Sequence, residues 1–293
     1  MAALAANTTI ATAKGVAAAL TGSAALFAET LHTIADAGNE VLLYIAIRRS
    51  RRPPDATHPL GYGAERYYWA LLAAIGIFVV GGAVSIWEGI NALIHPPPLD
   101  AFWVGVVVLV VALILDGLSR TVAIRSLRAQ AERRGVTVRQ LLRESPDPTI
   151  TTVYLEDTID VVGAALALLA LVLHRVTGSA LPDALATLAI GGLLVLVASR
   201  LARRNRELLT NQAVPERYVE QLSSEIAAQD GIMRVDSVEA IYLGPREVLV
   251  AADVVMAPGL DGPEIAEALI AARRRLCTDV TVIARLYLTP VAA

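Results

Sequence analysis

Five side chains with nitrogen or oxygen ligand atoms lie in two apolar stretches of the sequence: His32, Asp36, Glu156, Asp157 and Asp160. His32 and Asp36 are four residues apart, and Asp160 follows Glu156 by four residues and Asp157 by three. Four residues turn an α-helix by about 400°, so the first two face the same side, one turn apart. An imidazole nitrogen with carboxylates suits Zn²⁺, Fe²⁺, Mn²⁺ or Co²⁺, and the set lacks the thiolates that Cu⁺ prefers. The pattern therefore predicts a divalent-cation site.

Burying these ionisable side chains in apolar stretches costs free energy. An ionisable side chain at membrane depth costs at least a few kcal/mol unless it pairs or faces water. Residues 26–47 and 151–173 contain no lysine or arginine, so their carboxylates repel one another unless a cation or protons lie between them. Alternatively, His32 is a satisfied interior histidine and Asp36 hydrogen-bonds to a neighbouring helix. The missing basic partner favours the cation.

The elements that must position these groups are membrane helices. Hydrophobic residues make up 55% of the 293 residues and charged residues 18%, with a mean hydropathy of +0.56, which is typical of a protein embedded in a lipid bilayer. Six apolar segments each approach or exceed the ~20 residues that cross a hydrocarbon core. They are roughly 4–21, 26–47, 67–94, 101–124, 151–173 and 181–202. The first has no features of a cleavable signal, and we expect it to be the first span.

Arginine residues predict the orientation of these spans. They crowd the connections after the second, fourth and sixth segments, whereas the alternate connections are short and nearly free of arginine. Arginine-rich connections lie in the cytoplasm, so we expect both termini there and place the protein in a bacterial inner (plasma) membrane. The net charge of −3 gives no sign of nucleic-acid binding.

The chain changes character near residue 208, which divides it into a predicted transmembrane domain (1–208) and a cytoplasmic domain (209–293). The second part has helical or alternating patterns and no run long enough to span a membrane. In chain order it predicts a helix at 214–229, strands at 237–244 and 246–257, a helix at 262–276 and a strand at 279–290. The order α-β-β-α-β predicts a small sheet with helices on one face.

Three motifs resemble those of the cation diffusion facilitator family. They are TGSAALFAETLHTIADAGNEVLL (21–43), DATHPLGYGAERYYW (55–69) and LEDTIDVVG (155–163). The nearest branch is the one that contains an animal mitochondrial zinc transporter. The resemblance implies a homodimeric metal/proton antiporter with six transmembrane helices and a cytoplasmic ferredoxin-like domain. It covers essentially the whole chain.

The sequence departs from the family pattern in the fifth span. Many members have His-xxx-Asp there; Asp157 matches the aspartate, but Val153 stands in the position of the histidine. Glu156 or Asp160 is the expected replacement as the fourth ligand.

Two other family sites are also altered. Between spans two and three Asp55 and His58 match a second metal site, but Tyr62 replaces its last histidine. We expect a weak site or none there, with His58 organising a turn as the alternative. The four histidines of the chain all precede residue 175, so the His-based zinc site in the cytoplasmic domain of some relatives cannot form.

The predicted function is export of a divalent cation, zinc by resemblance, in exchange for protons. The ligands must be deprotonated to bind metal, so metal binding releases protons. We expect no prosthetic group and no enzymatic activity, since the sequence has no HExxH pair and no phosphate-binding loop. Two alternatives stay open: a membrane scaffold with a structural metal site, and an intramembrane metalloenzyme.

Overall fold

The computed structural model describes residues 2–133 and 135–292. The chain forms two compact units, one comprising Met1–Arg48 with Tyr67–Arg206 and the other Arg49–Arg66 with Glu207–Ala293. The second unit therefore includes the connection between the second and third long helices.

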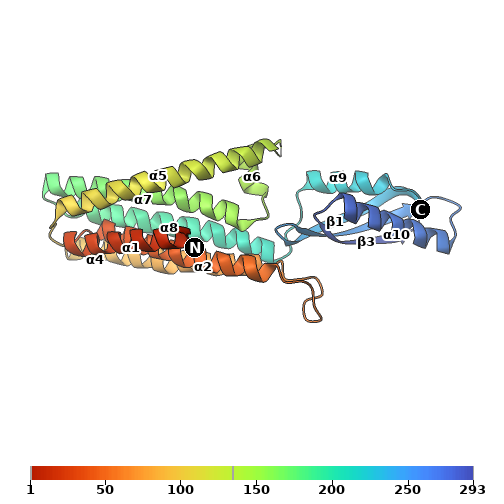
Figure 1. Ribbon diagram of the computed structural model, residues 1–293, viewed down its shortest axis with the longest axis horizontal. Helices are drawn as coiled ribbons and strands as arrows, with labels where there is room; N and C mark the ends of the chain where they lie inside the picture. The colour runs from red at the N-terminus through yellow and green to blue at the C-terminus, as the bar shows by residue number, and fades with distance from the viewer. Residues whose placement is uncertain (1, 134, 293) are drawn as a thin grey trace. The chain divides into compact units, whose positions relative to one another are not determined.

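The first unit is a bundle of helices (Figure 1). Their bounds are α1 Ala2–Thr21, α2 Ala24–Ser50, α3 Glu65–Gly76, η1 Ile77–Ala83, α4 Val84–Ile94, α5 Phe102–Arg133, α6 Val138–Glu144, α7 Pro148–Thr177 and α8 Leu181–Leu209. The short π-helix η1 joins α3 and α4 into one continuous helical segment. Every predicted span is helical, and α6 is a short helix that the sequence did not indicate.

Four helical segments are apolar and long enough to cross a membrane, as found among the described residues: Glu65–Ile94, Phe102–Arg133, Pro148–Thr177 and Leu181–Leu209. Helices α1 and α2 lie outside this set. Helix α2 has polar and charged side chains buried in the bundle, among them Glu29, His32 and Asp36. The predicted class, a helical membrane protein with a small C-terminal α/β domain, is confirmed.

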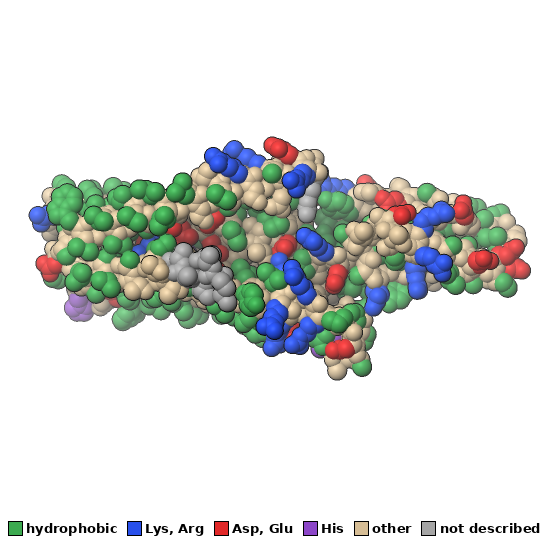
Figure 2. Space-filling view, viewed as in Figure 1, with side chains coloured by type: hydrophobic (Ala, Val, Ile, Leu, Met, Phe, Trp, Pro, Cys, Tyr) green, Lys and Arg blue, Asp and Glu red, His purple; other side chains and the backbone are tan. Residues whose placement is uncertain are grey.

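The outer surface of the bundle is apolar. Figure 2 shows hydrophobic side chains over its visible face and basic side chains gathered where α5 ends. On α5, Trp103 is 74% exposed, Leu118 61% and Val122 66%. Exposed apolar side chains of this kind fit contact with lipid rather than water.

Small residues allow the helices to approach closely. Ala25 and Ala28 of α2 and Ala167 of α7 are fully buried in one core cluster. On α8, a Cβ added to Gly191 would lie 2.8 Å from the Ile86 side chain and 3.1 Å from the carbonyl oxygen of Gly82. Such contacts are the main way in which membrane helices gain packing energy.

Helix α7, which positions the acidic motif, has clear signals at both ends. The Asp147 carboxylate accepts a hydrogen bond of 3.0 Å from the Thr149 backbone nitrogen, and Pro148 occupies the first turn. Gly178 ends the helix in the left-handed conformation, at φ 67°. These caps fix where the acidic motif falls along the helix.

The start of α2 is fixed by Asp183 of α8. This buried carboxylate accepts hydrogen bonds from the Ser23 hydroxyl (2.7 Å) and the Ala24 backbone nitrogen (2.6 Å). It thus satisfies a donor at the N-terminus of the helix that holds His32.

We expect Asp183→Ala to lower the free energy of unfolding by about 1–3 kcal/mol, because two buried donors lose their acceptor. Denaturant titration of the purified protein in detergent measures the change. Asp100→Ala, at an exposed position before α5, serves as the control. Equal stability of both variants would contradict the capping role.

The second unit contains a sheet of three strands within the described part of the chain, in the order β1-β2-β3. The elements are α9 Glu216–Ala227, β1 Ile232–Gly244, β2 Glu247–Met256, α10 Gly262–Asp279 and β3 Ile283–Val291. Strands β1 and β2 are antiparallel, with Ala240 opposite Val250, and β2 and β3 are parallel, with Ala252 opposite Leu288. Helix α9 contacts β1, α10 contacts β3, and the helices contact each other, so they share one face. The predicted order α-β-β-α-β is confirmed.

Candidate metal site

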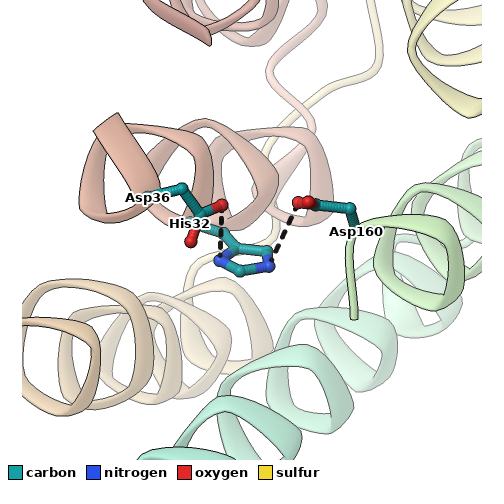
Figure 3. Close-up of side chains that lie close together, drawn as sticks. All are labelled: His32, Asp36 and Asp160. Carbon is teal, nitrogen blue, oxygen red and sulfur yellow. Dashed lines mark ion pairs between the residues drawn. The ribbon is translucent and has the colours of Figure 1, made fainter. Parts of the chain in front are cut away.

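His32, Asp36 and Asp160 meet in the interior of the bundle (Figure 3). The His32 ring lies between the two carboxylates, with Nδ1 3.3 Å from Asp36 Oδ2 and Nε2 3.3 Å from Asp160 Oδ1. One ligand atom from each residue can be chosen so that all three lie within 4.8 Å of one another. The two helices that carry the predicted motifs, α2 and α7, therefore form one candidate site.

Three polar atoms of this site are buried without hydrogen bonds among the described residues. His32 is 0% exposed and Asp36 6%. Both ring nitrogens of His32 and Oδ1 of Asp36 have no hydrogen-bond partner within the described residues, since the close contacts to the carboxylates lack hydrogen-bond geometry. Buried polar groups are nearly always satisfied. A bound cation, or protons held by the carboxylates, would satisfy them here.

One ligand atom from each residue lies within 4.8 Å of the other two, so the three side chains would move closer together around a tetrahedral divalent ion. Ligand atoms about 2.0–2.2 Å from Zn²⁺ lie roughly 3.3–3.5 Å from one another. A single ion can bind only one nitrogen of the His32 ring. The other nitrogen would then face a carboxylate, which is the usual arrangement for a metal-binding histidine.

Glu156 lies one helical turn from this site, next to Asn39 of α2. Its Oε1 accepts a hydrogen bond from Asn39 Nδ2. Asn39 is three residues after Asp36 on α2, and Glu156 is four residues before Asp160 on α7. Glu156 is not part of the three-residue cluster, and its role as a fourth ligand stays a prediction.

Asp157 faces a different helix. Its Oδ1 accepts a hydrogen bond of 3.1 Å from Ser119 Oγ on α5. The structure thus brings Asp160, rather than Asp157, to His32. That Asp160 replaces Asp157 as the ligand from α7 stays a prediction.

Comparison with known proteins now bears on this site. Residues 1–210 match the model of the cation efflux transmembrane domain. The chain belongs to the cation efflux family. This confirms the predicted membership in the cation diffusion facilitators, a family of transporters rather than enzymes, and with the four apolar helices it makes the chain an integral membrane protein.

Several curated proteins are similar to this cation efflux protein. The mitochondrial proton-coupled zinc antiporter SLC30A9 of Mus musculus is 33% identical over 80% of this chain and 41% of its own length. Metal tolerance protein C4 of Arabidopsis thaliana is 34% identical over 76% of this chain and 48% of its own. The cation-efflux pump FieF of Cronobacter sakazakii is 28% identical over 78% and 71%. The chain thus spans less than half the length of the first two relatives.

The second predicted site, Asp55 with His58, forms a hydrogen-bonded turn. The Asp55 carboxylate accepts hydrogen bonds from Tyr62 Oη (2.7 Å), the Thr57 hydroxyl (2.7 Å) and the His58 backbone nitrogen (2.8 Å). The His58 ring packs on Tyr62, with ring centroids 4.1 Å apart. This arrangement is the one expected if His58 organises a turn, and metal binding there stays a prediction.

These hydrogen bonds, that of Tyr62 foremost, hold the pKa of the Asp55 carboxyl well below its usual range. Because the pKa is lowered by folding, the ionised form stabilises the turn above the ordinary aspartate pKa of about 3.9, and this contribution is lost as the pH falls toward the folded value.

We expect Tyr62→Phe to raise the pKa of Asp55 toward the ordinary value. An NMR titration of the Asp55 carboxyl carbon measures it, with Tyr287→Phe, an exposed tyrosine of β3, as the control. A carboxyl that titrates as in the wild type would contradict the role of the Tyr62 hydroxyl.

One charged residue near the site was missed by the sequence argument. Lys14 of α1 is buried, and its Nζ lies 3.0 Å from Glu29 Oε2 on α2. Lys14 lies outside residues 26–47 and 151–173, the two stretches whose lack of lysine and arginine favoured a bound cation. Lys14 is the one lysine of the chain and stands in a predicted span, which was itself a signal, because a lysine at membrane depth needs a partner.

Proposed function

We propose that this cation efflux protein is an antiporter that exports a divalent metal ion, zinc, in exchange for protons through the site between α2 and α7. The observation that carries this proposal is the convergence of His32, Asp36 and Asp160, in which both ring nitrogens of His32 and Oδ1 of Asp36 are buried without hydrogen-bond partners among the described residues. Ionisable side chains are costly inside an apolar bundle, so their presence indicates that this group binds a cation or protons.

The chemistry of the ligands couples metal to protons. Carboxylates and imidazole bind a divalent ion only when deprotonated, so protons arriving at the site release the metal, and metal arriving releases protons. If the helices rock so that the site opens to one side of the membrane at a time, this exchange becomes antiport. Asp36, Asp160 and His32 would be the residues that exchange.

Zinc is the proposed ion among several that fit. A ligand set of one histidine and carboxylates accepts Zn²⁺, Fe²⁺, Mn²⁺ and Co²⁺ alike. Zinc is favoured because relatives from animals are named proton-coupled zinc antiporters. The function needs no prosthetic group, since the ion is the substrate.

We further propose a location and an assembly. The arginines in the connections after the second, fourth and sixth spans support cytoplasmic termini. The proposed location is a bacterial inner membrane, where such connections face the cytoplasm; one similar protein is a bacterial cation-efflux pump, and the mouse relative is named mitochondrial. The assembly is a homodimer, as the family resemblance implies.

Uptake of metal into sealed proteoliposomes under an imposed pH gradient tests the proposal. We expect zinc to enter vesicles that are acidic inside, and competition with Mn²⁺, Fe²⁺ and Co²⁺ to rank the ions. Zinc that binds to the protein but does not cross the membrane would support the structural-site alternative instead. Uptake independent of the pH gradient would exclude proton coupling.

A further inference from the structure

An ion pair between α1 and α2 lies completely inside the bundle. Lys14 is 1% exposed and Glu29 0%. Lys14 Nζ donates hydrogen bonds of 3.0 Å to Glu29 Oε2 and 3.0 Å to Thr33 Oγ1. Burying two full charges costs several kcal/mol per ion before their attraction offsets it, so the pair calls for a reason beyond holding two helices together.

The pair lies one helical turn from the metal site. Glu29 is three residues before His32 on α2, and side chains three apart on a helix are neighbours, about 5–6 Å between Cβ atoms. Thr33, which accepts the second hydrogen bond from Lys14, is adjacent to His32.

Helix α7 makes room for Glu29 on the same side of the site. Gly163 is three residues after Asp160, and a Cβ built on it would overlap Glu29 Oε1. Three contacts between α2 and α7 give the relative direction of the two helices: Asn39 with Glu156, His32 with Asp160, and Glu29 with Gly163. The residue number decreases on α2 as it increases on α7, so the helices are antiparallel here. The ion pair therefore forms the next layer above the site on both helices.

The charges of the two layers can be counted separately. With His32 neutral, Asp36 and Asp160 together give −2, which matches one divalent ion; the Glu156 carboxylate, hydrogen-bonded to Asn39, lies one turn away and is not counted here. The Lys14–Glu29 layer has no net charge. Removing either partner would place an uncompensated charge next to the site, in surroundings where charges act strongly on one another.

We propose that Lys14 and Glu29 form a charge-balancing pair that sets the metal affinity of the His32–Asp36–Asp160 site. Glu29 shields the incoming cation from Lys14, and Lys14 holds one oxygen of Glu29 away from the ion. Both are positioning residues, and this inference rests on the proposed function of the site.

Zinc titration of the purified full-length protein in nanodiscs tests the pair. Glu29→Gln leaves Lys14 facing the ion, and we expect binding at least about tenfold weaker. The double variant Lys14→Met/Glu29→Gln removes both charges and restores affinity to within about threefold of wild type, because the layer is neutral again. Wild-type affinity in Glu29→Gln, or a double variant as weak as the single one, overturns the proposal.

Lys14→Met is expected to change the zinc affinity in the opposite direction and tests the proposal independently. It leaves Glu29 facing the site without its cation, and we expect tighter zinc binding, whereas a purely structural role predicts weaker binding in both single variants. Unchanged or weaker binding in Lys14→Met contradicts the proposal, even where Glu29→Gln does not fold. Glu88→Gln on α4 is the matched control for loss of a carboxylate. Wild-type flux in proteoliposomes, measured in parallel, reports on the proposed function separately.

Discussion

Asp160→Asn is expected to abolish zinc flux driven by a pH gradient, whereas Asp157→Asn keeps most of it. Asp160 lies 3.3 Å from His32 and is a ligand in the proposed function, while Asp157 faces Ser119 on α5. Loss of a ligand carboxylate should reduce zinc affinity at least about 100-fold, more than the effect typical of residues that only support a ligand.

Initial rates of zinc uptake into proteoliposomes, normalised to the amount of inserted protein, measure this contrast. The two variants are matched in chemistry and are only three residues apart on α7, so each controls for the other. Loss of flux in Asp157→Asn with retention in Asp160→Asn would contradict this prediction. It would mean that Asp157, the residue that matches the family's aspartate, is the ligand from α7.

His32→Asp is expected to shift the preferred ion from zinc toward manganese. The imidazole nitrogen suits Zn²⁺, whereas a site made only of carboxylates suits Mn²⁺ and other hard cations. We expect zinc affinity to fall at least about tenfold and the affinity for Mn²⁺ to change less, since a carboxylate keeps an oxygen ligand where the nitrogen was.

Competition between zinc and manganese for the purified variant measures the shift, with His95→Asp, at an exposed connection, as the control. Unchanged zinc preference in His32→Asp would mean that His32 does not bind the ion and serves only to orient the carboxylates.

Much of the fold could be predicted because it follows from hydrophobic pattern. Apolar runs predicted the long helices, and alternation predicted the order of elements in the C-terminal domain. Strand β1 begins at Ile232 rather than at 237, because Arg234 and Asp236 interrupt the apolar pattern in an exposed part of the strand. Helix α6, with seven residues, is too short for periodicity to reveal.

Of the site, the sequence alone could predict only which residues of a single helix share a face. The spacing of His32 and Asp36 fixes their common face regardless of packing. The choice between Asp157 and Asp160 depends on which face of α7 meets α2, and three residues change that direction by only about 60°. The contact of Lys14 with Glu29 depends on how α1 packs, which sequence spacing does not encode.

The most direct test of the central claim is a zinc gradient imposed across proteoliposomes with no initial pH difference, with an entrapped dye reporting internal pH. If the buried His32–Asp36–Asp160 site exchanges metal for protons, zinc entering the vesicles drives protons out and the interior becomes alkaline, and Asp36→Asn removes both movements. Zinc entry with no change of internal pH, or an alkaline interior that persists in Asp36→Asn, would contradict it.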